Sequence, residues 1–464
     1  MNTRPNILFI MSDDHAAHAI SAYGSQINQT PNIDRLAAQG VRLTNTFCTN
    51  ALCTPSRATI LTGQYSHVNQ VKTLDDEIDS SLPIQSQKLL KQAGYETAIV
   101  GKWHLGNNEA SNPQGFDYWN ILPGQGDYYD PVMIENGVEH KLEGYVTDLI
   151  TDISVEWLES RDSEAPFFLM VHHKAPHSSW IPAKRHQNLG VEGKFPEPET
   201  LMDDYETRSE AVKITSIRVE DTRKANLKVD PPEGISQDEK RKWAYQRYIT
   251  DYTRTVQAVD DSVGTLLDYL DEQGLADNTL IIYTSDQGMF LGDHGWHDKR
   301  YMYEESLRMP FIARLPGKIE AGSIASDMLL NVDFAPTLMD YADVEVPVEV
   351  QGSSGRGILE GATPDDWQKS LYYRYWMHTI GHKVIPNYGV RNERYKLIFY
   401  YGVTVEDTHN PDIDIAAEWE LYDLKADPCE VNNVYGQPEF AGVQAEMLAE
   451  LDHLQAKVGD EPRH

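Results

Sequence analysis

Four short, continuous apolar runs constrain the fold of this chain more than any other feature. They lie at residues 6–11, 96–100, 166–171 and 279–284. Because the runs do not alternate between apolar and polar positions, they are typical of strands buried on both faces of a parallel sheet. Segments with helical spacing separate them, so the sequence predicts an α/β fold in which helices cover a central sheet.

The predicted helices lie at residues 31–40, 82–94, 145–159 and 243–274, and a further strand is expected at 309–314. The last helix is the clearest, because apolar residues recur at three-to-four spacing from Tyr245 to Leu270 before Gly274 ends the pattern. Residues 182–242 lack this periodicity and are rich in charge. We therefore expect an insertion of loops and short helices that rims the pocket.

The chain has two parts in this interpretation. Its 464 residues are enough for one large domain and a smaller one. After about residue 365 the sequence pattern changes. It predicts strands rich in aromatic residues at 371–377 and 395–401 and a final helix at 438–458. We predict a main domain over residues 1–365 and, over residues 366–464, a smaller α+β subdomain with an antiparallel sheet that contributes to the pocket.

Charge and composition exclude several classes of function. Asp plus Glu number 72 and Lys plus Arg 40, a formal charge of −32, so nucleic acid is not an expected partner. An anionic ligand would then need a local basic pocket. No apolar run is long enough to span a bilayer, and three cysteines leave no disulfide framework. No leader precedes the first strand, so we expect a cytoplasmic protein, or a periplasmic or extracellular one if a leader was removed.

Polar side chains follow the predicted strands at the point where each strand ends. They are Asp13 and Asp14, Lys102 and His104, His177, and Asp286 with Gln287. In an open α/β sheet the carboxyl ends of the strands line a common crevice, so these residues are expected to converge. Three carboxylates and an amide oxygen suit Ca²⁺ or Mg²⁺ rather than Zn²⁺. An Asp-Asp pair alone is more often a solvated loop, but the acid after a second strand favours a metal site.

The stretch from Cys53 to Gly63 reads Cys-Thr-Pro-Ser-Arg-Ala-Thr-Ile-Leu-Thr-Gly. We predict a short helix whose start is marked by Pro55 and Ser56. The sulfur then lies at the positive end of a helix, where an anion can bind, with Arg57 beside it. A cysteine near a helix start is, taken alone, more often a buried small apolar side chain.

This stretch resembles the Cys-x-Pro-Ser-Arg and Leu-Thr-Gly pattern of the sulfatase family, within the alkaline-phosphatase-like superfamily. Further matches are Gly-Lys-Trp-His-Leu-Gly at 101–106, His177 in Ala-Pro-His and Lys299 in Asp-Lys-Arg. They follow in family order between residue 6 and about residue 401. The resemblance implies a large, mixed, mostly parallel sheet. It also implies that a formylglycine-generating enzyme converts Cys53 to formylglycine, an aldehyde whose hydrate is the nucleophile.

The same resemblance assigns expected roles to single residues. The implied metal ligands are Asp13, Asp14, Asp286, Gln287 and the modified Cys53. Arg57 and Lys102 would hold the hydrated aldehyde, and His177 and Lys299 would grip the sulfate. Asp286 is the candidate base for attack, either His177 or Lys299 would protonate the leaving group, and His104 would help regenerate the aldehyde. Gln287 departs from the family pattern, which more often has Asn or His there.

The expected substrate is a sulfated oligosaccharide or polysaccharide. Candidate substrate-binding residues at the rim are His15, His294, His297, Arg374, His378 and His382, with Trp180 and Trp376 as stacking surfaces. Residues 372–391 resemble the C-terminal segment of sulfatases that act on polysaccharides, which favours a glycosaminoglycan or an algal glycan. Two alternatives stay open: a phosphodiesterase or phosphonate monoester hydrolase of the same superfamily, and a sulfated-glycan-binding protein without catalysis.

Overall fold

The computed structural model describes residues 4–161, 164–190, 193–377, 382–403 and 414–461. Its centre is a mixed sheet with strand order β12-β2-β11-β8-β1-β7-β3-β4-β5-β6, and β13 pairs with β2 at one end. The strands are β1 (Asn6–Ser12), β2 (Val41–Phe47), β3 (Glu96–Lys102), β4 (Tyr118–Leu122), β5 (Val132–Glu135), β6 (Val138–Lys141), β7 (Phe167–His172), β8 (Thr279–Ser285), β11 (Arg308–Arg314), β12 (Ser323–Ala325) and β13 (Leu329–Leu330). The predicted mixed, mostly parallel sheet is confirmed.

The four apolar runs form β1, β3, β7 and β8, which lie side by side and parallel at the centre of the sheet. Both faces of these strands are buried, which explains why their sequences do not alternate between apolar and polar residues. Ile7 and Phe9 point into the core on one side of the sheet, and Leu8 and Ile10 point into the core on the other. β11 is antiparallel to both β8 and β2, which the sequence did not indicate.

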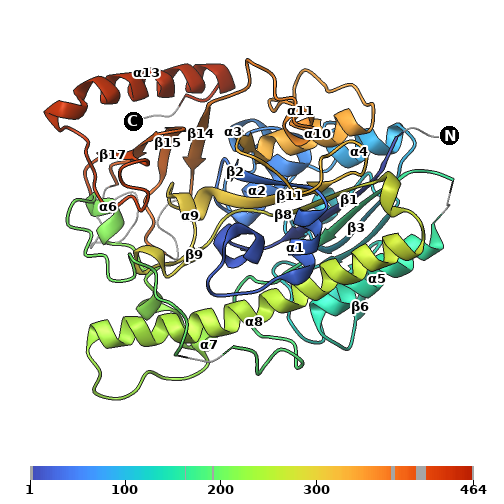
Figure 1. The fold of residues 1–464 in the computed structure, drawn as a ribbon, viewed down its shortest axis with the longest axis horizontal. Helices are drawn as coiled ribbons and strands as arrows, with labels where there is room; N and C mark the ends of the chain where they lie inside the picture. The colour runs from blue at the N-terminus through green and yellow to red at the C-terminus, as the bar shows by residue number, and fades with distance from the viewer. Residues whose placement is uncertain (1–3, 162–163, 191–192, 378–381, 404–413, 462–464) are drawn as a thin grey trace.

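Helices cover both faces of the sheet (Figure 1). One layer contains α1 (Pro31–Ala38), α5 (Val146–Ser160) and α8 (Gln237–Glu272), and both α1 and α5 contact α8. The other contains α2 (Cys53–Thr62), α4 (Ser86–Gln92) and α10 (Phe334–Tyr341). The start predicted for α8, residue 243, is wrong. The helix begins six residues earlier because Ser236 and Glu239 form a capping box ahead of a charged first turn.

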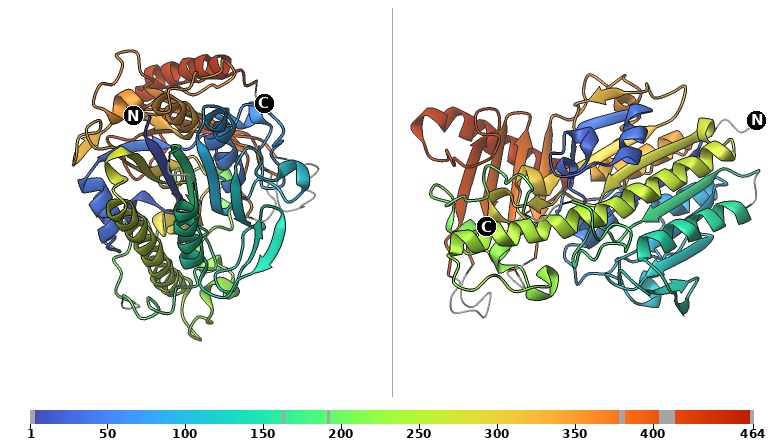
Figure 2. Two further views of the ribbon diagram at one scale, coloured as in Figure 1. Left: turned by 90° about the vertical axis from the view of Figure 1, so that its right-hand side faces the viewer. Right: turned by 60° about the horizontal axis from the view of Figure 1, so that its bottom comes forward.

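The segment between β7 and α8 contains α6 (Glu210–Lys213), η4 (Val219–Asp221) and α7 (Lys224–Leu227). These short helices are joined by loops, and η4 and α7 contact α8. Figures 1 and 2 show this segment beside one end of the long α8, next to the C-terminal sheet. It thus reaches the same end of the molecule as the carboxyl ends of the central strands.

A second sheet, antiparallel as predicted, follows in the order β14-β15-β16-β17. Its strands are β14 (Ser370–Tyr375), β15 (Asn387–Asn392), β16 (Tyr395–Tyr400) and β17 (Glu418–Asp423), and α13 (Ala441–Val458) lies across it. The boundary at residue 365 stays a prediction. Among the described residues, no helix combines the length and the apolar character needed to cross a membrane.

A buried ion cluster ties this second sheet to the first. Lys396 on β16 lies 3.0 Å from Glu304 and 2.7 Å from Glu430, and Arg391 on β15 also pairs with Glu304 at 3.1 Å. Glu304 begins α9 (Glu304–Leu307), which leads directly into β11 of the central sheet. Because these charges are removed from water, each depends on its partners. The cluster therefore holds the C-terminal sheet in a defined position beside the central one.

Candidate active site

The carboxyl ends of β1 and β8 bring three aspartates together. Ser12 and Ser285 are paired at the ends of these strands, so Asp13, Asp14 and Asp286 follow side by side. The Asp14 backbone N–H donates to Asp286 Oδ1 over 3.2 Å. One carboxylate oxygen of each aspartate lies within 4.8 Å of the others. Residues 272 positions apart thus share one centre.

Cys53 is the first residue of α2 and lies against this centre. Its Sγ is 3.4 Å from Asp13 Oδ1 and 3.8 Å from Gln287 Nε2. The predicted start of the helix at Pro55 and Ser56 is wrong by about two residues, because proline fits the first turn of a helix, where its missing N–H is not needed. Burial, reinforced by Asp13, raises the pKa of the Cys53 thiol to about 12. The thiol itself is therefore protonated at neutral pH.

Each of the three aspartates has its own cation. Lys102 Nζ pairs with Asp13, Lys299 Nζ lies 2.5 Å from Asp14 Oδ1, and Arg57 Nε lies 3.0 Å from Asp286 Oδ2. Lys102 is the last residue of β3, Lys299 lies in the loop before α9, and Arg57 lies on α2. Sequence patterns had placed all six residues in the site, and the structure brings all six together.

The carboxylates differ in how readily they ionise. Burial opposes the charge on Asp13, but Lys102 and the neighbouring cations hold its pKa well below the usual range. Burial and the nearby Asp13 raise the pKa of Asp286 to about 7. Burial likewise raises the pKa of Asp14, although Lys299 opposes the shift. The Asp13 carboxylate is therefore charged. The charged forms of Asp14 and Asp286 are destabilised by burial and by Asp13, and a bound cation would reduce this destabilisation.

The donor set fits a hard divalent cation. Three carboxylates converge, and the buried Gln287 Oε1 has no hydrogen-bond partner among the described residues. Gln287 Nε2 donates to Asp14 Oδ1 over 2.5 Å, so the amide lies against the cluster. Oxygen atoms in this arrangement are ligands that Ca²⁺ and Mg²⁺ accept. The cluster can hold such an ion.

Gln125, which the sequence analysis missed, links two of the predicted catalytic residues. Its Oε1 accepts from Lys102 Nζ over 2.5 Å, and its Nε2 lies 3.2 Å from His104 Nε2. A lysine can only donate, so the amide NH₂ must face the histidine and donate to Nε2. His104 Nδ1 then carries the proton and faces Thr54 Oγ1 at 3.3 Å. Burial and Lys102 hold the pKa of His104 well below its usual value, so the ring is neutral.

Gln125 was missed because β4 was not predicted. The loop after β4 opens at the same sheet edge as the loops after β1, β3, β7 and β8, since β4 is parallel to β3. A search of polar residues after residues 118–122 would have found it.

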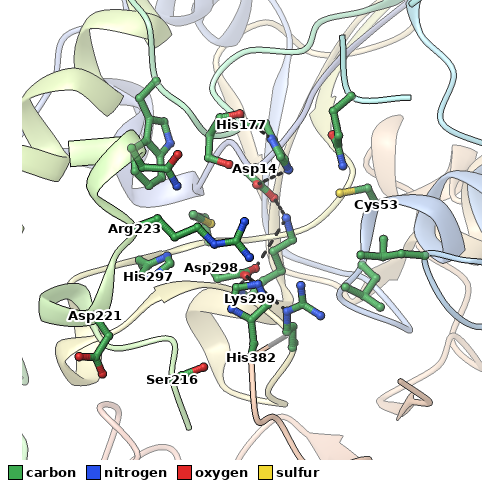
Figure 3. A pocket seen from close by; sticks show the side chains of 18 residues that line it. Asp14, Cys53, His177, Ser216, Asp221, Arg223, His297, Asp298, Lys299 and His382 are labelled. Carbon is green, nitrogen blue, oxygen red and sulfur yellow. Dashed lines mark hydrogen bonds and ion pairs between the residues drawn. The ribbon is translucent and has the colours of Figure 1, made fainter. Parts of the chain in front are cut away.

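A cavity of about 300 Å³ opens beside Cys53 and Asp14 (Figure 3). His177 and Lys299 line it, as an anion-binding role requires. His177 Nε2 lies 3.8 Å from Asp14 Oδ2, and burial keeps the pKa of this ring well below its usual value. The two residues predicted to bind the sulfate, His177 and Lys299, thus face the cavity next to Cys53.

The predicted rim residues divide into two groups. His297 and His382 line the cavity, as does the nearly buried Trp180. The expectation is wrong for His15 and His294, which are fully buried. His15 Nδ1 lies 2.5 Å from the Tyr283 hydroxyl, and His294 Nδ1 lies 3.0 Å from Asp203 Oδ2.

The prediction that Arg374 lies at the rim of this cavity is also wrong. It pairs with Asp460 at 2.5 Å, and its guanidinium lies 3.4 Å from the centre of the Trp376 ring, beside a different cavity. His378 lies outside the described residues. Polar character alone did not show which way these side chains point, because a histidine or arginine can equally be satisfied inside the protein.

Several lining residues had no predicted role. Asp298 and Arg300 flank Lys299 and pair with each other at 3.3 Å, and His382 Nε2 lies 3.4 Å from Asp298. Arg300 also donates to the hydroxyl of Tyr375 on β14, so the C-terminal sheet supports this wall. The Asp-Lys-Arg motif could have predicted that Asp298 and Arg300 lie at the site, because they are the neighbours of Lys299. Arg223, from the segment before α8, has no comparable motif.

The comparisons with known proteins agree on one family. A family model described as Sulfatase matches residues 5–344, and a model described as N-sulphoglucosamine sulphohydrolase, C-terminal, matches residues 292–457. An N-acetylglucosamine-6-O-sulfatase of Bacteroides thetaiotaomicron is 45% identical, over 98% of this chain and 87% of that protein.

Solved structures agree with these matches. A protein in complex with its substrate D-glucosamine-2-N,6-O-disulfate superposes with a TM-score of 0.90 at 43% identity, covering 98% of both chains. A phosphonate monoester hydrolase of Agrobacterium radiobacter superposes with a TM-score of 0.77 at 21% identity, covering 98% of this chain and 96% of that one. The second likeness shows a shared fold.

Proposed function

Because the chain belongs to the sulfatase family and hydrolyses O-sulfate esters of sulfated carbohydrates, we propose that its substrate is a 6-O-sulfated glucosamine of a glycosaminoglycan. The observation that carries this proposal is the structural relative that binds a 6-O-sulfated glucosamine and matches this chain almost from end to end. Sulfated polysaccharides do not cross membranes unaided, so we expect the enzyme to meet them in the periplasm or outside the cell.

The wall around Lys299 supports a sugar rather than a simple aryl sulfate. Asp298, Arg300 and His382 form a connected set of donors and acceptors beside the anion grip. Such convergent polar groups suit the hydroxyls of a pyranose ring. Trp180 adds an apolar surface next to them, held against Tyr248 with 4.5 Å between ring centres.

We further propose that the chain carries two groups that its sequence does not encode. A divalent cation, Ca²⁺ or Mg²⁺, would be held by Asp13, Asp14, Asp286 and Gln287, and a formylglycine-generating enzyme would convert Cys53. Together they would supply a Lewis acid and an activated oxygen nucleophile. The buried Gln287 oxygen without a described partner supports the cation, and the Cys-Thr-Pro-Ser-Arg sequence that begins at Cys53 supports the conversion.

The chain's own side chains then have the following roles in the proposal. Arg57 and Lys102 stabilise negative charge at position 53. Lys102 pairs with Asp13, which contacts Cys53, and Arg57 lies one turn after Cys53 on α2. Lys299 and His177 bind the sulfate, and one of them protonates the departing sugar oxygen. His104 is neutral, and Gln125 orients its ring by donating to Nε2. To act as a base, His104 would accept a proton from the group at position 53 at this nitrogen, in place of the Gln125 hydrogen bond.

The test is sulfate release from defined saccharides by protein produced with and without a formylglycine-generating enzyme. We expect release from 6-O-sulfated glucosamine with the matured protein only, and an aldehyde at residue 53 by mass spectrometry. Cys53→Ala is the control without a nucleophile. Equal activity of a preparation that contains only intact thiol would contradict the maturation step. Faster turnover of a phosphonate monoester than of every sulfated sugar would favour the phosphonate alternative instead.

A further inference from the structure

One wall of the cavity comes from the segment between β7 and α8 and carries an arginine without a described ion-pair partner. Ser216, Asp221, Arg223 and Asn226 line the cavity there. Arg223 directly precedes α7 and is exposed to solvent. Within the described part of the chain, its guanidinium forms no hydrogen bond or ion pair. The charge is therefore available to a ligand.

The other cations of the cavity are already matched. Lys299 pairs with Asp14 at 2.5 Å, and Arg300 pairs with Asp298 at 3.3 Å. Asp221 is the remaining acid of this wall, and it forms no ion pair with Arg223 in the part of the chain that the structure describes. Arg223 is thus the lysine or arginine of this cavity that has no ion-pair partner among the described residues.

Arg223 points into the cavity rather than away from it. Figure 3 shows its side chain extending toward Asp14 and Lys299, on the other side of Lys299 from Cys53. Its charge also acts on the opposite wall. Burial lowers the pKa of His382, Asp298 opposes the shift, and Arg300 and Arg223 add to it. A sugar whose scissile sulfate lies between Cys53 and Lys299 would therefore have Arg223 facing its other substituents.

We propose that Arg223 binds a second anionic group of the substrate, distinct from the sulfate that is removed. The inference rests on the proposed function and names a specificity determinant within it. A guanidinium binds a sulfate or carboxylate with two parallel hydrogen bonds, which a neutral acetamide cannot accept in the same way. The shared chemistry is an oxyanion, and its source is either an N-sulfate on the same ring or the carboxylate of an adjoining uronic acid. In a protein of formal charge −32, such a local cation is also what lets a multiply charged saccharide enter.

The experiment compares kcat/KM for three saccharides. They are N-acetylglucosamine 6-O-sulfate, glucosamine 2-N,6-O-disulfate, and N-acetylglucosamine 6-O-sulfate linked to a uronic acid. In Arg223→Ala, the preference for a doubly charged over the singly charged saccharide should fall by about tenfold, the scale of one lost hydrogen bond between charged groups. Arg223→Lys should keep part of the preference, because charge remains but the fork is lost.

Lys224→Ala is the matched control. It removes the same charge from the neighbouring residue, whose ammonium pairs with the exposed Asp230 at 2.6 Å and does not line the cavity. Lys224→Ala should leave the preference at the wild-type value. Added NaCl should reduce the preference of the wild type and leave that of Arg223→Ala unchanged. Thermal unfolding of each variant confirms that the fold is retained.

The outcomes separate the two proposals. A fall for the disulfate alone assigns the N-sulfate as the second anion, and a fall for the uronate-linked sugar alone assigns the carboxylate. Equal losses of kcat/KM on all three saccharides, or an unchanged preference, overturn the inference while the proposed function stands. Failure of the wild type to release sulfate from any of the three overturns the proposed function and the inference with it.

Discussion

Gln125 lines the cavity, but its described side-chain hydrogen bonds go to Lys102 and His104, so it should affect turnover more than substrate binding. It joins Lys102 to His104 through two hydrogen bonds, one to an ammonium and one to a neutral imidazole. The first is expected to contribute roughly 1.5–3 kcal/mol and the second about 1 kcal/mol. If both serve the transition state, Gln125→Leu removes about 3 kcal/mol, which corresponds to a loss of roughly 100-fold in kcat.

Gln125→Glu is the sharper perturbation. A glutamate still accepts from Lys102, but it offers no proton to His104 Nε2 and places a negative charge beside the ring. The pKa of His104, which burial and Lys102 now hold well below its usual value, should rise. A larger fraction of the ring is then protonated at a given pH, so the acid limb of the kcat profile should move to higher pH.

The assay is steady-state sulfate release as a function of substrate concentration and pH, with formylglycine and metal content measured for each preparation. Gln351→Leu is the matched control, because Gln351 also makes two hydrogen bonds, to Tyr65 N over 2.9 Å and to the Val458 carbonyl over 2.8 Å, away from the cavity. It should lower stability and leave kcat unchanged. If Gln125→Leu raised KM at constant kcat, or if Gln125→Glu left the pH profile unmoved, the orientation argument would be refuted.

Further predictions concern stability and the metal. Lys396→Met should lower the free energy of unfolding by about 3–5 kcal/mol, because it strands the buried carboxylates of Glu304 and Glu430, and urea titration measures the loss. Burial disfavours the charged Glu304, but Lys396 and Arg391 hold its pKa well below 4.5. Its stabilising contribution is therefore full above pH 4.5 and should decrease progressively as the pH falls from 4.5 toward the lowered pKa, which thermal unfolding between pH 6 and 3 can show. Ser236→Ala should cost about 1 kcal/mol through the lost cap of α8, measured in the same way. Chelation should lower both activity and the unfolding midpoint, and added Ca²⁺ should restore both; an unchanged midpoint would count against a bound cation.

Local pattern predicted the elements that are buried on both sides. β1, β3, β7 and β8 were found within two residues of their observed ends, because a strand covered on both faces must be apolar throughout. The residues just after these strands were predicted to meet, since parallel strands end at one edge. β4 was not predicted, and β11 was predicted as a strand at 309–314 but without its antiparallel pairing, because pairing depends on neighbours that are distant in the sequence.

Sequence alone therefore determined the four parallel strands at the centre of the sheet, the short helix near Cys53 and the identity of the charged residues around it. Tertiary structure decided that His15 and His294 are interior side chains, that Gln125 orients Lys102 and His104, and that Arg223 enters the cavity from a distant segment. The reason is physical: the spacing of apolar residues dictates local structure, whereas the direction of a polar side chain depends on which partners the folded chain places beside it.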